Sequence, residues 1–337
     1  MNRLSKLVAA AAALLTIGGM ASAQAEVKIA IGGASCLCYL PTVLAKQLGN
    51  YEKAGVDVQL INFKGGSQAL TAVVGGSADV VSGYFDHTIE LAAKNQHLKS
   101  FVVYDRVPGL VLVVAPDQTG KITSVKDLKG KKVGVSAPGS STDFFLKYEL
   151  KEAGLPTDSA AVIGVGLGGT AIAAMEQGQI DAAVMLDPAV TVLQQKYKDL
   201  TILTDTRSQA DTEKVFGGDY PGGAFYTKDS WLKENPKDAQ GLVNAMLATL
   251  DWIHSHSPKE IMEKMPPEMV GSDKDAYLAA LKNTMPMYSK DGMMDPKGAQ
   301  AVLDVFSVGS PDVAKANIDV TSTYTNEFVK KAHARLD

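Results

Sequence analysis

The stretch Lys131–Leu150, KKVGVSAPGSSTDFFLKYEL, decides the fold of this 337-residue chain. Its β-branched run around Val133 and Val135 predicts a short buried strand. Ala137-Pro138-Gly139 ends that strand, and the apolar spacing from Phe144 onward predicts a helix. A strand, a glycine turn and a helix N-terminus leave backbone N–H groups pointing outward. This arrangement suits an anionic ligand group.

Three hydroxyl residues, Ser140, Ser141 and Thr142, follow the turn as candidate N-caps. They could merely cap their own helix, or they could line a ligand site together with Gly139. We favour the ligand site because the same structural unit occurs twice in the chain.

An earlier copy of the unit spans Lys28–Val81. Each copy predicts a strand, a loop, a helix that ends at a glycine, a second strand, a helix that starts at a glycine turn, and a third strand. The first helix of the earlier copy is expected over Pro41–Lys53. Gly65-Gly66-Ser67 corresponds to Gly168-Gly169-Thr170 in the later copy. Two such β-α-β-α-β units predict two lobes that enclose a ligand between the carboxyl ends of their parallel strands.

Polar and aromatic residues follow the third strand of each copy, where such a ligand would be met. One segment is Ser82-Gly83-Tyr84-Phe85-Asp86-His87. Its aromatic pair could equally belong to the hydrophobic core, although glycine, aspartate and histidine are unusual neighbours for core residues. In the other segment, Asp187 could accept a ligand N–H or hydroxyl, or could cap the helix expected over 189–197. With the hydroxyl turn, the full set of candidate ligand-binding residues is Cys36, Cys38, Tyr39, Ser67, Ser82, Tyr84, Phe85, Gly139, Ser140, Ser141, Thr142, Thr170, Asp187, Phe225 and Tyr226.

The two cysteines of the chain, Cys36 and Cys38, lie in the loop after the first strand. They are too close in sequence for an easy disulfide, although an oxidising compartment makes a strained one possible. No cluster of cysteine or histidine accompanies them, which argues against a metal site. We interpret them as small apolar residues that line a pocket.

Composition and charge narrow the class of protein. With 46% hydrophobic and 21% charged residues, the chain can build two ordinary cores. Residues 1–25 combine a basic start, an apolar run and Ala21-Ser22-Ala23, which is typical of a secretory signal peptide. No later apolar stretch is long enough to span a membrane. An acidic, exported chain without a basic cluster is a poor nucleic-acid binder.

The segment Ser124–Val135, SVKDLKGKKVGV, followed by a Gly-Ser-Ser helix start, resembles periplasmic substrate-binding proteins of ABC importers. The resemblance is to the nitrate, aliphatic-sulfonate and taurine branch, which also contains receptors for pyrimidine precursors of thiamine. Gly49–Val58 and Trp231–Pro236 are similar to the same branch. The resemblance implies an α/β, type II periplasmic binding protein fold. Each lobe would be a mostly parallel sheet flanked by helices, and two hinge crossovers would join the lobes.

This resemblance, combined with the repeat, divides the chain. We expect a signal peptide over 1–25, lobe 1 over 26–115 and 225–337, and lobe 2 over 116–224. The aromatic residues near the predicted site suit an organic ligand body rather than nitrate. The resemblance then implies a monomeric periplasmic receptor that captures a small organic anion, a sulfonate or an aromatic or other organic carboxylate, and docks on an ABC permease in the inner membrane.

We expect no enzyme, no cofactor and no metal, because no catalytic or dinucleotide motif is present. Alternatives are a receptor for a thiamine pyrimidine precursor, a related pyrimidine-synthesising enzyme, and a sensing domain that docks on a receptor kinase. An enzyme of that kind would need a cysteine-rich iron motif and pyridoxal phosphate, whereas this chain offers only Cys36-Leu37-Cys38 and an export signal.

Overall fold

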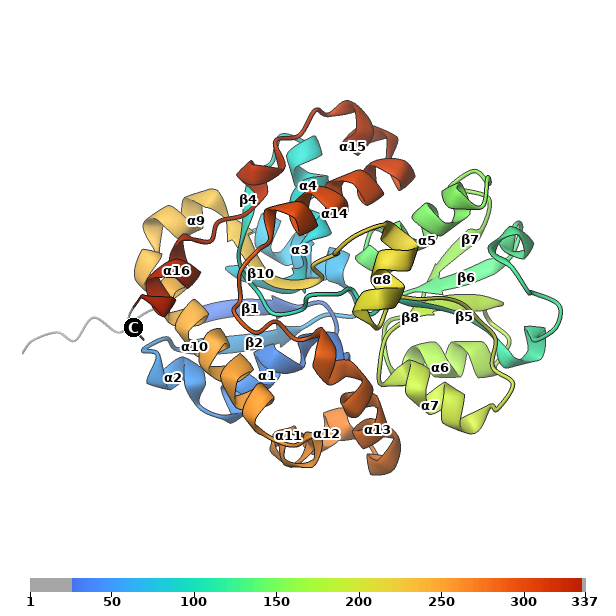
Figure 1. Ribbon diagram of the computed structural model, residues 1–337, viewed down its shortest axis with the longest axis horizontal. Coiled ribbons are helices and arrows are strands. Elements are labelled where there is room, and N and C mark those ends of the chain that lie inside the picture. The colour runs from blue at the N-terminus through green and yellow to red at the C-terminus, as the bar shows by residue number, and fades with distance from the viewer. Residues whose placement is uncertain (1–25, 335–337) are drawn as a thin grey trace, which may run out of the picture.

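The computed structural model describes residues 26–334, so the predicted signal peptide lies outside the described residues. Two five-stranded sheets organise the chain, and Figure 1 shows them side by side with helices packed around each. The first sheet has the order β2-β1-β3-β10-β4, with β1 Val27–Ile31, β2 Val58–Asn62, β3 Val80–Tyr84, β4 Leu98–Val103 and β10 Gly223–Lys228. The second has the order β7-β6-β8-β5-β9, with β5 Val111–Val114, β6 Lys132–Val135, β7 Ala161–Gly164, β8 Ala182–Met185 and β9 Ile202–Asp205.

The structure confirms the predicted repeat. In the first sheet β1 pairs in parallel with β2 and β3, and in the second β6 pairs in parallel with β7 and β8. An equivalent hydrogen bond marks the amino end of β1 and of β6. Asp79 Oδ2 accepts from the Lys28 amide at 2.8 Å, and Asp181 Oδ2 accepts from the Lys132 amide at 2.8 Å. Both carboxylates therefore lie at the end of their sheet that is opposite the predicted ligand site.

The helices follow the two sheets in chain order, and the helix expected over Pro41–Lys53 is divided. Gly49, with a left-handed φ of 67°, separates it into two helices. Around the first sheet lie α1 Leu40–Gln47, α2 Asn50–Lys53, α3 Gly66–Val74 and α4 Asp86–Ala93. Around the second lie α5 Ser141–Glu152, α6 Gly169–Glu176, α7 Ala189–Lys196 and α8 Gln209–Phe216. The C-terminal part adds α9 Asp229–Glu234, α10 Pro236–Ser255, α11 Pro258–Lys264, α12 Pro267–Val270, α13 Lys274–Thr284, α14 Pro296–Gly309, α15 Pro311–Lys315 and α16 Glu327–His333.

The chain crosses between the sheets twice, after β4 and before β10, and the two crossing segments are tied to each other. The amides of Tyr104 and Asp105 donate to the Gly223 carbonyl at 2.9 and 3.1 Å, and the Gly222 amide donates to the Asp105 carbonyl at 3.0 Å. We call the first sheet with its helices lobe 1 and the second with its helices lobe 2. Because β5 pairs inside the second sheet and β10 inside the first, we propose lobe boundaries near residues 110 and 222.

Helices from the C-terminal part also reach lobe 2. Helix α13 packs on α7, and α14 packs on α5 (Figure 1). The Phe144 and Phe306 rings bring α5 and α14 together with their centroids 4.4 Å apart. Within residues 26–334, no helix has the length and apolar character needed to cross a membrane.

One buried carboxyl makes the stability of lobe 2 depend on pH. Glu149 on α5 is only 8% exposed, and its Oε2 accepts a hydrogen bond from Thr204 Oγ1 at 2.7 Å. Burial raises the pKa of Glu149 from 4.5 to about 7. The folded chain therefore holds this proton in a pH range where the unfolded chain has lost it.

We expect Glu149→Gln to remove this pH dependence. Between about pH 4.5 and pH 7, wild-type stability should fall as the pH rises, because the unfolded state binds fewer protons than the folded state. At about pH 8 the variant should be more stable by up to about 3 kcal/mol. Urea unfolding at several pH values measures the difference. The exposed control Glu263→Gln should leave the wild-type slope unchanged, and an unaltered slope in Glu149→Gln would contradict the assignment.

Candidate functional site

A small cavity lies between the lobes at the carboxyl ends of their parallel strands. It measures about 10 Å³, which is room for about one water molecule. None of its lining side chains carries a formal charge. The lining consists of Gly32, Tyr39, Gly66, Tyr84 and Leu110 on one side and Ser136, Ser140, Ser141, Thr142, Leu167 and Leu186 on the other.

Two helix N-termini meet at this cavity, that of α3 from lobe 1 and that of α5 from lobe 2. The structure gives no acceptor within residues 26–334 for the amides of Gly66, Ser141 and Thr142. Unpaired amides at a helix N-terminus carry partial positive charge and attract anions. The cavity thus presents N–H donors from both lobes without any cationic side chain.

The three hydroxyls of the turn are engaged away from their own helix in this closed arrangement. Ser140 Oγ accepts from the Ser67 amide at 3.0 Å and donates to Ser67 Oγ at 3.2 Å, across the lobes. Thr142 Oγ1 accepts from the Ser136 amide at 3.0 Å, and Ser141 Oγ donates to Asp86 Oδ1 at 2.7 Å. Ser140 makes no side-chain capping bond to α5. The hydroxyls therefore join the lobes and brace the loop, while the amides stay open.

Two of the predicted aromatic residues line the cavity. The Tyr39 and Tyr84 rings meet edge to face with centroids 6.2 Å apart. Tyr84 donates its hydroxyl hydrogen to the Pro108 carbonyl at 2.5 Å, whereas the Tyr39 hydroxyl has no hydrogen-bond partner among the described residues. Burial and the nearby carboxyl of Asp105 hold the pKa of Tyr39 well above its usual range. Tyr39 therefore stays protonated and offers a donor to the cavity.

The other predicted aromatic residues belong to the core. Phe85 is buried with Tyr324 at an edge-to-face centroid distance of 6.4 Å. Phe225 packs between aromatic rings of the first sheet, and the Tyr226 hydroxyl is hydrogen-bonded to His87 Nδ1 at 2.8 Å. None of the three lines the cavity. The alternation of side chains along β10 buries both of its aromatic residues because helices cover both faces of the sheet.

Three further candidates lie beside the cavity rather than in its wall. Ser82 is fully buried and bonded to Thr42 Oγ1 at 2.7 Å and to Tyr104 OH at 2.8 Å. Thr170 is exposed and donates to the Leu167 carbonyl. Gly139 faces Ser67 across the lobe boundary, where a Cβ would stand 3.8 Å from the serine Cβ. Gly139 and Ser67 thus form the rim of the site.

Asp187 acts as a cap in this structure. Its Oδ1 accepts from the Thr191 amide at 3.0 Å and from Thr191 Oγ1 at 2.8 Å, in the first turn of α7. Its Oδ2 pairs with Arg207 Nη1 at 3.3 Å, and its carbonyl accepts from the Leu37 amide at 2.9 Å. The side chain is therefore committed to lobe 2, and the backbone joins the lobes.

Cys36 and Cys38 form a disulfide, the alternative that the sequence analysis did not favour. Both half-cystines are buried and line a space of about 10 Å³ with Asp187 and Arg207, next to the main cavity. They are therefore part of the lobe boundary but do not line the cavity between the two helix N-termini.

Asp86 and His87 are not among the predicted site residues, although their position directly after β3 is a signal for a ligand site. Asp86 is 1% exposed and His87 fully buried. Burial raises the pKa of Asp86, while His87 and the hydrogen bond from Ser141 act in the opposite direction. The His87 ring meets the Phe144 ring of lobe 2 edge to face at 5.9 Å. Both residues therefore belong to the contact between the lobes.

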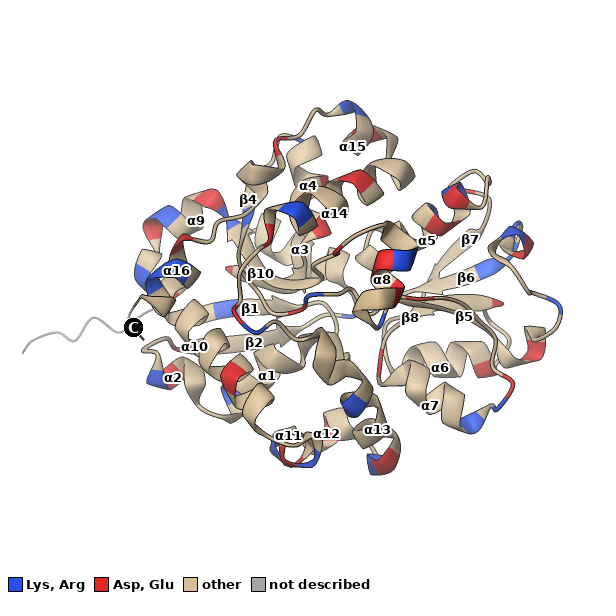
Figure 2. Cartoon of the chain, in the orientation of Figure 1, with Lys and Arg blue, Asp and Glu red and all other residues tan. Residues whose placement is uncertain are grey.

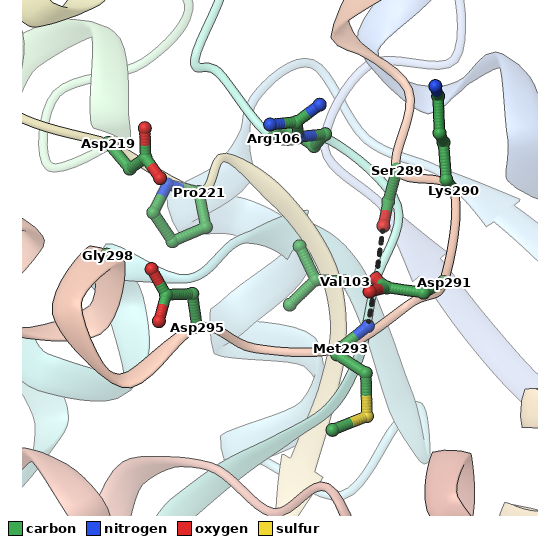
Figure 3. A pocket seen from close by; sticks show the side chains of 10 residues that line it. All are labelled: Val103, Arg106, Asp219, Pro221, Ser289, Lys290, Asp291, Met293, Asp295 and Gly298. Atoms are coloured by element: carbon green, nitrogen blue, oxygen red, sulfur yellow. Dashed lines mark hydrogen bonds between the residues drawn. The ribbon is translucent and has the colours of Figure 1, made fainter.

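A larger hollow lies elsewhere, at the crossing segments. It measures about 350 Å³, and its wall includes Arg106, Lys290, Asp219 and Asp295 (Figure 3). Charges of both signs stand side by side there, as they do over the outer helices in Figure 2. None of the predicted site residues lines this hollow. No cluster of three or more metal-binding side chains occurs within residues 26–334.

Comparisons with known proteins agree on one fold. A family model described as "NMT1/THI5 like" matches residues 39–261. A solved structure from Bordetella bronchiseptica RB50 is 38% identical, covers 93% of this chain and 98% of its own, and superposes with a TM-score of 0.89. The alkanesulfonate-binding protein SsuA from Xanthomonas axonopodis pv. citri, solved with MOPS, is 18% identical, with 90% and 100% covered and a TM-score of 0.68.

A curated relative from Brucella abortus (strain 2308), named as a binding protein, is 27% identical over 223 residues. That match spans 66% of this chain and 65% of the relative's length. Together these likenesses confirm the predicted two-lobed α/β fold of periplasmic binding proteins.

Proposed function

Because the chain belongs to the NMT1/THI5-like family, we propose that it is an extracytoplasmic receptor that captures a small organic anion by lobe closure. The observation that carries this proposal is the pair of opposed helix N-termini. Gly66 of α3 and Ser141 and Thr142 of α5 supply unpaired amides from both lobes to one cavity. An anion that bridges these amides is bound more tightly by the closed form than by the open form.

The hydrogen-bond donors of the cavity favour a ligand head group whose negative charge is delocalised over several oxygen atoms. Hydrogen bonds from N–H groups to an anion are shorter and about twice as strong as neutral ones, and two helix dipoles add to them. The cavity wall contains no lysine or arginine. A sulfonate or carboxylate can therefore bind through backbone amides and the Tyr39 hydroxyl when the lobes stand farther apart than in this structure, where the cavity holds about one water molecule.

The remaining wall is apolar and favours a small organic body next to the head. Tyr39, Tyr84, Leu110, Leu167 and Leu186 supply it. Because Phe85, Phe225 and Tyr226 lie in the core, the apolar surface is smaller than the sequence analysis expected. We therefore expect a ligand whose organic body is a short alkyl chain or a single ring rather than a larger group. Nitrate would leave this apolar surface without a partner.

Closure requires the crossing segments to bend while the lobes move as units. In the open form, Ser67 and Ser140 would separate and water would occupy the cleft. A ligand that bridges the open amides then adds its own hydrogen bonds to these interlobe bonds and shifts the population to the closed form. We extend the proposal to export by residues 1–25, action as a monomer in the periplasm, and delivery to an ABC permease.

One observation favours a second candidate, a receptor for a thiamine pyrimidine precursor. The buried carboxyl of Asp86 lies one hydroxyl away from the cavity and could receive hydrogen bonds from an aminopyrimidine after Ser141 turns. We rank it second because the Asp86 carboxyl lies behind Ser141 and outside the cavity wall, whereas Gly66, Ser141 and Thr142 offer open amides in that wall.

A thermal-shift screen of the mature protein tests the proposal. The panel contains nitrate, taurine, alkyl and aryl sulfonates, aromatic carboxylates and thiamine pyrimidines. We expect a selective rise in melting temperature with a sulfonate or carboxylate, since a ligand at a hundred times its Kd stabilises the native state by about 2.7 kcal/mol. A response to a neutral pyrimidine with silence across all anions would replace the first candidate by the second.

A further inference from the structure

Asp86 is a buried carboxyl that reaches the cavity through one side chain. It opens α4 at the carboxyl end of β3. Its Oδ1 accepts from Ser141 Oγ at 2.7 Å, and its Oδ2 accepts from Tyr220 OH at 3.4 Å. Ser141 itself lines the cavity. Within the described chain, no lysine or arginine forms an ion pair with Asp86.

The carboxyl fixes what Ser141 can offer a ligand. A hydroxyl has one hydrogen and two lone pairs, and the hydrogen of Ser141 goes to Asp86. Its remaining lone pairs are therefore what this oxygen presents to the cavity. Ser140 likewise donates to Ser67. The donors left for a ligand are the three backbone amides, the Tyr39 hydroxyl and one hydroxyl hydrogen of the Ser136–Thr142 pair.

This distribution of donors and acceptors favours the binding of singly charged head groups over doubly charged ones. A single negative charge can be shared among the amides of the two helix N-termini. A second charge would face the Ser141 oxygen with a carboxyl directly behind it, and no cation in the cavity wall would compensate. Like charges this close disfavour each other strongly where water is excluded.

We propose that Asp86, acting through Ser141, is a positioning residue that makes the site selective for monoanionic heads over dianionic ones. The inference rests on the proposed anion receptor and names its substrate class more narrowly: sulfonates and carboxylates, with phosphate monoesters excluded once fully ionised. The ionisable groups that face Asp86 are His87 and Glu90 on its own helix, Tyr220 from the second crossing segment, and Tyr39, Tyr84 and Tyr226 from the first lobe.

Two probes of nearly equal shape test the selectivity. Ethyl sulfate is a monoanion throughout, whereas ethyl phosphate gains its second charge near pH 6. Isothermal titration of the mature protein should give similar affinities for both at about pH 5. At about pH 8 ethyl phosphate should bind at least about tenfold more weakly, because of the second charge. Any ionisation of Asp86 over this range acts in the same direction.

We call the ratio of the two affinities, ethyl sulfate over ethyl phosphate, the gap. In Asp86→Asn the gap at about pH 8 should narrow to about threefold or less, since asparagine keeps an acceptor for Ser141 without the charge. Tyr220→Phe is the matched control: it removes the other partner of Asp86 and should keep the full gap. If Asp86→Asn does not fold, Asp86→Ser serves instead, because it also removes the charge, and it should narrow the gap in the same way. A merely structural role would lower both affinities together and leave their ratio unchanged.

The outcomes separate the inference from the function on which it rests. Equal binding of both probes by the wild type at about pH 8, or an unchanged gap in Asp86→Asn, would overturn the selectivity and leave the receptor in place. Failure of both probes at both pH values would overturn the anion receptor and this inference with it.

Discussion

Replacing Ser140, Ser141 and Thr142 together by alanine is expected to weaken anion binding by roughly a hundredfold. The triple variant loses the interlobe hydrogen bonds of Ser140 with Ser67 and the bond by which Thr142 holds the Ser136 amide. It also leaves the buried Asp86 without Ser141. At about 0.7 kcal/mol for each hydrogen bond, these four losses amount to about two powers of ten.

Isothermal titration with the anion identified by the screen measures this effect. Ser257→Ala is the matched control, because Ser257 caps α11 far from the cavity. It should lower the free energy of unfolding by about 1 kcal/mol and leave the affinity unchanged. Unchanged affinity in the triple variant would show that the three hydroxyls do not stabilise the ligand-bound form, since alanine keeps the backbone amides of α5. Because the three residues are adjacent, the single variants need not add up to the triple.

Gly65→Ala is expected to block closure and to reduce affinity by roughly thirtyfold or more. Gly65 has an extended backbone with a φ of −165°, which any residue adopts, so lobe 1 tolerates alanine. In the closed form the added Cβ would stand 2.9 Å from the Ala137 Cβ and 3.1 Å from the Ala137 amide nitrogen, across the lobes. The methyl group thus penalises only the closed form.

Small-angle X-ray scattering with and without ligand follows the closure directly. The wild type should become more compact with ligand, and Gly65→Ala should not. Gly169→Ala is the control, because its added Cβ meets no atom within 4 Å. A Gly65→Ala protein that compacts and binds like the wild type would show that the contact between Gly65 and Ala137 is not needed in the ligand-bound form.

The contrast among the candidate aromatic residues shows where sequence reasoning loses information. Tyr84 ends β3 and Phe85 follows it, whereas Phe225 and Tyr226 lie in the middle of β10 and Tyr39 lies in the 3₁₀ turn before α1. Only Tyr39 and Tyr84 line the cavity. The face that each ring covers depends on the helices packed above and below the sheet, and the strand pattern does not contain that information.

The cysteine pair gives a second case. The short spacing of Cys36 and Cys38 favoured free side chains, yet the 3₁₀ turn over Leu37–Tyr39 brings the sulfur atoms together. The interpretation of the two residues as part of a pocket wall agrees with their position beside Asp187. Local geometry of this kind depends on the backbone angles of a three-residue turn, which composition alone does not fix.

The sequence by itself determined the repeated β-α-β-α-β unit, its glycine turns and the two helix N-termini, because alternation, capping and turn formation act between neighbours in the chain. The tertiary structure alone decided which groups the turn hydroxyls would meet. Ser140 forms hydrogen bonds with Ser67, and Ser141 forms one with Asp86, each across the boundary between the lobes. A hydroxyl accepts any well-placed partner, so only the packing of one lobe against the other selects that partner and leaves the amides free for a ligand.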